Sequence, residues 1–202
     1  MREHALVIYE PMTVLTDYLL AGFAFAFALR LWRPNRAWSM AFLFTAAGAI
    51  TGGSFHAIAP RLTTSAEQQV WLATVLFIGA ASCFLLAGLG RGFAVFAVVK
   101  FSAYAMWVRL DPSFIVVIAD YGTSMLLVGV VHAVRWSRAS PWVLGGIAMS
   151  ALAAVIQASG FALHPHFNHN DLYHVVQIVA LWLLYRGGKQ GIDGRAVDVT
   201  SS

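Results

Sequence analysis

The sequence predicts an all-α fold, a polytopic membrane protein built as one bundle of seven transmembrane helices. The first indication is composition: 59% of the 202 residues are hydrophobic, 11% are charged, and the mean hydropathy is +0.72. Soluble domains carry about 25% charged residues. The second is a series of seven apolar segments that are long enough, or nearly so, to cross a hydrocarbon core of about 30 Å. The third is that tryptophans fall near the segment ends, where interfacial aromatic residues belong. These tryptophans are Trp32, Trp38, Trp71, Trp107, Trp136, Trp142 and Trp182.

The apolar segments follow one another closely along the chain. Short connections such as "RPNR", "GRG" and "SRAS" join them, so consecutive segments are expected to be antiparallel neighbours in one bundle. The first segment is too long for a signal peptide, follows an acidic flank and precedes no clear cleavage site, so it is predicted to remain as a helix. The predicted spans are 11–32, 37–60, 68–90, 93–109, 112–134, 141–163 and 171–186.

The predicted spans form a single transmembrane domain, residues 1–186. Residues 187–202, "GGKQGIDGRAVDVTSS", are polar and rich in glycine, which predicts a disordered cytoplasmic tail. The single cysteine, Cys83, excludes an internal disulfide framework.

Lysine and arginine are distributed unequally between the two predicted faces of the membrane. By the positive-inside rule this asymmetry predicts an outside N-terminus and an inside C-terminus, in the inner (plasma) membrane of the cell. The basic residues are scattered between apolar runs and form no stripe, which argues against a nucleic-acid partner. The predicted cytoplasmic face carries Arg30, Arg33, Arg36, Arg91, Arg135, Arg138, Arg186 and Lys189, and the other face carries Arg2, Arg61 and Arg109.

Ionisable residues from four predicted helices fall at the outer end of the bundle. Asp17 lies in the outer half of the first helix, and His56 lies near the outer end of the second. Glu67 begins the third helix on the same side, and Asp171 and His174 open the seventh. Polar groups at membrane depth are costly and usually face the bundle interior. The sequence therefore predicts a polar cluster at one depth.

Two members of this cluster also have simpler interpretations. Asp171 follows Asn170 at a predicted helix start, where carboxylates cap exposed backbone N–H groups. His56 could instead be an interfacial histidine that hydrogen bonds to a carbonyl group. The sequence leaves both interpretations open.

Lys100 and Asp120 form a second polar feature, away from this cluster. Each lies ten residues from Leu110, which is in the turn between the fourth and fifth segments. In an antiparallel hairpin both side chains would therefore reach the same level, about 15 Å from the turn and near the middle of the bilayer. Because charges within a membrane usually pair with one another, an ion pair is predicted.

The opening of the seventh segment, "HNDLYH" at residues 169–174, supplies residue types that bind zinc. A zinc site needs about four ligands, and a catalytic site keeps one position for water. Asp171 and His174 share one helical face at a spacing of three residues, whereas His169 could ligate only from a non-helical start. His56 would complete the site from the second helix. The candidate metal ligands are His56, His174, Asp171 and His169.

A zinc-bound water also requires a group that accepts its proton. Glu67 and Asp17 are the candidates, either as the base or as residues that orient a ligand. Neither an H-E-x-x-H motif nor paired cysteines occur, so the prediction rests on the arrangement of residues and not on a signature.

The pattern resembles the superfamily of alkaline ceramidases and progestin/adipoQ receptors, seven-helix membrane proteins with an intramembrane zinc ion held by three histidines. His56 matches the histidine of the second helix, and His174 matches the second histidine of the seventh. Glu67 stands where that superfamily carries an acid, and Glu10 or Asp17 matches an acid in the first helix. The resemblance implies zinc-dependent hydrolysis of an amide in a lipid.

The sequence departs from this superfamily at two positions. Gly52 stands where the superfamily has a serine four residues before the histidine, and Ser54 is a nearby candidate for that role. Asn170 stands where the first histidine of an H-x-x-x-H motif is expected, so Asp171 or His169 would have to replace it.

Two classes of function therefore stay open. The first is a zinc-dependent intramembrane hydrolase that cleaves an amide or ester bond of a lipid. The second is a non-enzymatic sensor, binding protein or proton-linked carrier that uses the same polar cluster. In both classes the lipid bilayer is the partner, and the sequence indicates neither the substrate nor the oligomeric state.

Overall fold

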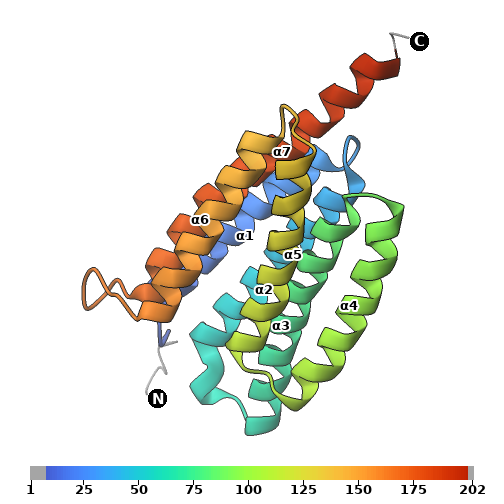
Figure 1. Cartoon of the computed structure of the whole chain (residues 1–202). Coiled ribbons are helices and arrows are strands. Elements are labelled where there is room, and N and C mark those ends of the chain that lie inside the picture. The colour runs from blue at the N-terminus through green and yellow to red at the C-terminus, as the bar shows by residue number, and fades with distance from the viewer. Residues whose placement is uncertain (1–7, 200–202) are drawn as a thin grey trace, which may run out of the picture.

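The chain folds as an all-helical bundle in a computed structural model that describes residues 8–199, with side chains to residue 190 (Figure 1). Within the described residues there are seven α-helices, and six of them are long and apolar enough to cross a membrane. The prediction of a helical membrane protein is therefore confirmed. The elements are α1 (Pro11–Leu31), α2 (Arg36–Ile58), the 3-10 helix η1 (Ala59–Arg61), α3 (Thr64–Ala87), α4 (Arg91–Leu110), α5 (Phe114–Val134), α6 (Ser140–Ser159) and α7 (His169–Val199).

Local sequence signals explain where these helices begin and end. Pro11 occupies the first turn of α1, where its missing N–H costs nothing. The side chains of Asn35 and Thr63 accept hydrogen bonds from backbone N–H groups three residues later, at 3.3 and 3.4 Å, and so cap α2 and α3. α6 ends at Gly160, whose φ of 66° is the left-handed conformation that glycine adopts at helix ends.

The order of packing differs in one place from the order along the chain. α1 packs on α2 and α7, α2 on α3, and α6 on α7. α4 and α5 were predicted to be close antiparallel neighbours, yet they contact each other little, and both pack on α3. The reason is a small apolar cluster that α3, α4 and α5 share, to which each contributes buried side chains. Its buried members are Val75, Tyr104, Val108, Val116 and Val117.

The predicted ion pair between α4 and α5 is confirmed. The Nζ atom of Lys100 lies 2.5 Å from Oδ1 of Asp120 and donates a second hydrogen bond to Oγ of Ser82, at 3.1 Å. Ser82 in turn lies 2.8 Å from Oγ of Ser124. The long lysine side chain thus reaches from the peripheral helix α4 to α3 and α5 and neutralises the Asp120 carboxylate inside the bundle.

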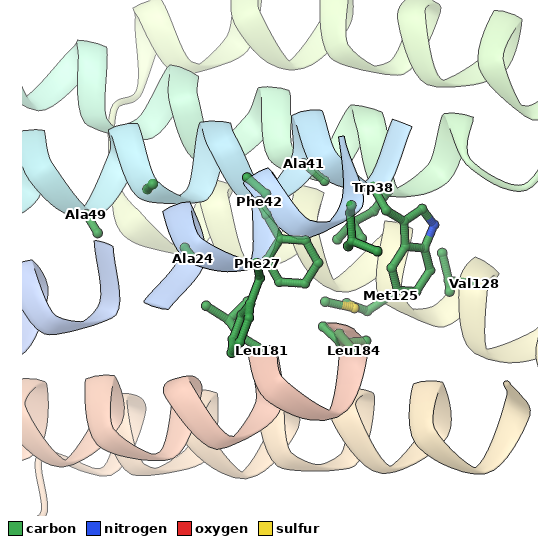
Figure 2. Packing of buried hydrophobic residues seen from close by; sticks show 14 of the residues in the cluster. Ala24, Phe27, Trp38, Ala41, Phe42, Ala49, Met125, Val128, Leu181 and Leu184 are labelled. Carbon is green, nitrogen blue, oxygen red and sulfur yellow. The ribbon is translucent and has the colours of Figure 1, made fainter. Parts of the chain in front are cut away.

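The apolar core fills the half of the bundle where α1 and α7 run past α2 (Figure 2). Phe27 stacks on Tyr185 with ring centroids 4.7 Å apart and meets Phe42 edge-on at 5.9 Å. Aromatic pairs favour such geometries. Trp38 is also buried and packs with Leu184 and Met125. Packed apolar side chains therefore fill the interior of this half of the bundle.

α7 continues beyond the predicted end of the last span. Residues 187–202 were predicted to be a disordered tail, but the helix extends to Val199, and its last turns project beyond the other helices (Figure 1). Gly187 and Gly188 explain why this stretch stays helical. A Cβ on Gly188 would lie 2.6 Å from the ring of Trp38, and one on Gly187 would lie 2.5 Å from Val143. These glycines permit close packing of α7 on α2 and α6, and they do not end the helix.

The two ends of the bundle differ in charge. We call the end where α1, α3, α5 and α7 begin the acidic end, and the end where α2, α4 and α6 begin the basic end (Figure 1). The acidic end carries Glu10, Glu67, Asp111 and Asp171, together with the two arginines Arg61 and Arg109. The basic end carries Arg30, Arg33, Arg36, Arg91, Arg135, Arg138, Arg186 and Lys189.

Candidate functional site

The start of α7 is held by a reciprocal pair of side-chain caps. Oδ1 of Asn168 accepts hydrogen bonds from the backbone N–H groups of Asn170 and Asp171, at 2.8 and 3.3 Å. Oδ2 of Asp171 accepts one from the backbone N–H of Asn168, at 2.7 Å. This arrangement has the geometry of a capping box. The capping interpretation of Asp171 is therefore confirmed as one of its roles.

The second oxygen of Asp171 joins α7 to α1. Oδ1 of Asp171 accepts a hydrogen bond from the Thr13 hydroxyl, at 2.8 Å, and both residues are almost completely buried. Asp171 therefore makes hydrogen bonds with both carboxylate oxygens, one within its own helix and one to α1.

His174 is held between two residues of α1. Its Nε2 lies 3.2 Å from Oδ1 of Asp17, and its Nδ1 lies 3.0 Å from the Thr16 hydroxyl. All three side chains are less than a tenth exposed. The structure thus brings together Asp17 and His174, as their predicted depths implied, and gives each ring nitrogen of His174 a partner.

Glycines in α2 allow this helix to approach Asp17. A Cβ on Gly53 would lie 2.9 Å from the Cβ of Asp17, and one on Gly52 would lie 3.8 Å from both of its carboxylate oxygens. Gly52 is the residue at the serine position of the resembled superfamily. Here the position provides close packing beside the Asp17 carboxylate.

His56 lies at the end of α2 and pairs with the segment that precedes α1. Its Nδ1 is 3.1 Å from Oε2 of Glu10. No hydrogen bond engages its Nε2 among the described residues. His56, Glu67 and His169 all line the same cavity at the acidic end, so these three predicted residues do share a site.

Of the predicted site residues, Asp171 and Ser54 do not line this cavity, and Ser54 also hydrogen bonds to none of the other predicted site residues. Its hydroxyl donates to the carbonyl oxygen of Ile50 at 2.8 Å and lies 3.1 Å from the Tyr18 hydroxyl. It does not line the cavity. In this arrangement Ser54 contacts α1, so it is not placed to act on a molecule in the cavity.

The cavity has a volume of about 880 Å³ and occupies the half of the bundle that the core leaves open. All the helices except α4 contribute to its walls. Its charged lining residues are Asp17 and Glu67, its histidines are His56, His169 and His174, and neither lysine nor arginine lines it. The remaining walls are mainly apolar, which is typical of a binding site for a small molecule.

Three contributors to the site were not identified from the sequence. Thr13 and Thr16 hydrogen bond to Asp171 and His174, respectively. The sequence could have indicated them because Thr13, Thr16 and Asp17 are spaced to share one face of an otherwise apolar helix. Gln157 of α6 donates to Oδ1 of Asn170 at 2.6 Å, while its Oε1 is buried without a partner among the described residues. A glutamine in an apolar helix indicates such a role.

Most of the predicted zinc ligands already have partners within the protein. Zinc requires about four ligands whose lone pairs are directed at the metal. Both oxygens of Asp171 and Nδ1 of His174 are already hydrogen bonded within the protein, and Nε2 of His174 faces Oδ1 of Asp17 at 3.2 Å. Among the side chains described, those of residues 8–190, no three histidine, cysteine, aspartate or glutamate side chains gather closely enough to hold a metal ion. As arranged, the residues do not fit the predicted zinc site, and zinc binding stays a prediction.

Fold and site together define a helical membrane protein with an internal cavity that is apolar along its walls and acidic at one end. The chain belongs to a family of unknown function, DUF6962, whose sequence model matches residues 12–193. No curated protein and no solved structure matches the chain. The resemblance to alkaline ceramidases therefore stays a prediction.

Proposed function

We propose that this protein binds an amphiphilic molecule in the cavity, with a positively charged or hydrogen-bond-donating head group at the acidic end, and does not cleave it. The observation that carries the proposal is the acidity of the lining: Glu67 contributes a carboxylate and Asp17 a second carboxyl group, and no lysine or arginine lines the cavity. A cleft lined by one sign of charge attracts a ligand of the opposite sign. A protonated amine fits these groups best.

The walls of the cavity suit the apolar part of such a ligand. Leu126 of α5 is 66% exposed and also lines the cavity, and Gly122 and Ala151 are exposed members of the same lining. α5 and α6 contact each other little and separate with distance from the loop that joins them (Figure 1). The cavity is therefore open toward lipid between α5 and α6, and the ligand enters from the membrane there.

The hydrolase is the less favoured function because its chemistry needs a metal-bound water. His174, its best ligand by sequence, is held by Thr16 and Asp17. Elemental analysis after purification without chelators separates the two functions. Binding alone predicts no stoichiometric zinc. Stoichiometric zinc that is lost in His56→Ala and His174→Ala, together with release of a fatty acid from a lipid amide or ester, would establish the hydrolase.

The proposal includes seven spans with the acidic end outside the cell. α7 packs along α1 and α6, both of which are long enough to span, so its predicted span 171–186 is taken to cross with them. The basic end then faces the cytoplasm by the positive-inside rule. A reporter enzyme fused after Ser202 should be active only in the cytoplasm, and activity outside would reverse the orientation.

Binding selectivity tests the proposed function. Purified protein in phosphatidylcholine nanodiscs is titrated with dodecylamine, dodecanol and dodecanoate, which share one chain length. We expect dodecylamine, which is protonated at pH 7, to bind most tightly and saturably. Glu67→Gln should weaken dodecylamine binding about tenfold, equivalent to about 1.4 kcal/mol, and leave dodecanol binding unchanged.

Asp111→Asn is the matched control, because Asp111 is an exposed carboxylate at the same end that does not line the cavity. It should bind all three probes as the wild type does. Equal affinity for dodecanoate and dodecylamine, or an effect of Asp111→Asn as large as that of Glu67→Gln, would refute the proposed selectivity.

A further inference from the structure

The basic end contains a concentration of charge that the proposed function does not use. Eight arginine and lysine side chains lie there, and between residues 8 and 190, where side chains are described, no carboxylate accompanies them. Asp193 is the next acidic residue along the chain. Most of these cations are exposed, as expected at a membrane face, but Arg186 is half-buried.

Arg186 is fixed in place by two tryptophans. Its guanidinium carbon lies 4.2 Å from the ring centroid of Trp142 and 5.5 Å from that of Trp182, and the two rings are perpendicular to each other. Guanidinium groups stack on aromatic rings through their faces, which leaves the N–H groups at the edge free to donate. No described residue accepts a hydrogen bond from them.

The turn that carries Arg186 is also anchored to α6. With its amide nitrogen directed at the carbonyl oxygen of Arg138, Gln190 donates to that oxygen at 2.6 Å and accepts from Nε1 of Trp142 at 2.9 Å. The guanidinium is therefore held in one orientation before any ligand arrives. Such preorganisation lowers the cost of binding.

A cavity of about 270 Å³ lies against this guanidinium, and we call it the Arg186 cavity. Its lining residues are Tyr185, Arg186, Lys189 and Gln190. These side chains carry a donor fork, an ammonium group, a phenol hydroxyl and an amide, and up to residue 190, where the described side chains end, no carboxylate lines the cavity. We infer that the Arg186 cavity binds a phosphate group, that of an anionic phospholipid.

The position of the Arg186 cavity identifies the lipid as the source of that phosphate. Tryptophans such as Trp142 and Trp182 mark the level of the lipid head groups, and the cavity lies beside both. Arginine binds phosphate through two parallel N–H···O bonds, and basic pockets at the membrane face bind anionic head groups. A free phosphate would share the chemistry of the head group but lack the anchoring chains.

Native mass spectrometry of protein released from nanodiscs of phosphatidylcholine and phosphatidylglycerol tests this inference. Wild type should retain one phosphatidylglycerol molecule selectively. Arg186→Gln should lower that affinity at least about tenfold, because hydrogen bonds to charged groups are strong. Arg91→Gln removes a cation from the same end but outside the cavity, so it should retain the lipid.

Arg186→Lys provides a second variant that keeps the charge and loses the donor fork, so it tests the inference even if Arg186→Gln fails to fold. It should also bind phosphatidylglycerol more weakly than wild type. Equal retention by Arg186→Lys, Arg91→Gln and wild type would overturn the inference. Displacement of the lipid by millimolar inorganic phosphate would overturn the assignment to a lipid. Binding of dodecylamine should be unaffected by either Arg186 variant, so the result is independent of the proposed function.

Discussion

The most deeply placed ionisable side chains are paired between helices. Asp17 of α1 meets His174 of α7, and Lys100 of α4 meets Asp120 of α5. In a low dielectric an unpaired charge is far more costly than a paired one. α4 packs on α3 but contacts α5 little, so the ion pair with Asp120 is its main link to α5.

The Lys100–Asp120 pair should show strong energetic coupling. Lys100→Met or Asp120→Asn alone leaves a buried partner without compensation, at a cost that can reach about 3–5 kcal/mol. The double variant removes both charges and should be less destabilised than either single variant. The free energy of unfolding of all four proteins in one detergent gives the coupling. Additive effects would show that the contact contributes no stability.

Asp171 provides a second test at the scale of a residue. Asparagine keeps an oxygen for the N–H of Asn168 and an amide for the Thr13 hydroxyl, and it caps helices about as well as aspartate. Asp171→Asn should therefore change stability by less than about 1 kcal/mol, whereas Asp171→Ala should cost about 1–3 kcal/mol. Thermal unfolding compares them. A severe loss in Asp171→Asn would mean that the negative charge itself is required.

At the scale of the helices, the apolar segments and their short connections predicted every helix to within a few residues at most ends. Lys100 and Asp120 are equally far along the chain from the turn between α4 and α5, which places them at the same depth. Their ion pair was therefore predictable from the sequence. The length of α7 was not, because Gly187 and Gly188 are typical of flexible tails in isolation. The two glycines serve close packing only because Trp38 and Val143 lie against them in the folded protein.

A pair of glycine substitutions tests this explanation of α7. Gly188→Ala places a methyl group 2.6 Å from the Trp38 ring, so it should destabilise the protein by about 1–3 kcal/mol, as overpacking does. Gly22→Ala meets no atom within 4 Å and should stabilise α1 by up to about 1 kcal/mol. The melting temperatures of both variants, measured in identical nanodiscs, check the contrast. A neutral Gly188→Ala would show that α7 is not packed on α2 at this point.

The whole molecule combines a closed half with a hollow half. Aromatic and leucine side chains fill the bundle toward the basic end, and the cavity occupies the half toward the acidic end. The sequence predicted that Asp17, His56, Glu67 and His174 lie at one depth, since depth follows from position along each helix. It could not predict which hydrogen bonds satisfy them, because these depend on the rotation of each helix about its own axis. The hydrogen bonds of Thr13 to Asp171 and of Thr16 to His174 depend on helix rotation in this way.

The proposed function requires the cavity at the acidic end to be a binding site. Gly122 lines it and a Cβ there would meet no atom within 4 Å, whereas a Cβ on Gly22 has equally open surroundings but Gly22 does not line the cavity. Gly122→Phe should therefore fill the entrance between α5 and α6 without unfolding the protein, and Gly22→Phe serves as its control.

The decisive measurement is the affinity of dodecylamine for both variants and for wild type in phosphatidylcholine nanodiscs. We expect Gly122→Phe to lower the affinity at least about tenfold at an unchanged melting temperature, and Gly22→Phe to bind as wild type does. Wild-type affinity in a folded Gly122→Phe variant would contradict the proposed function.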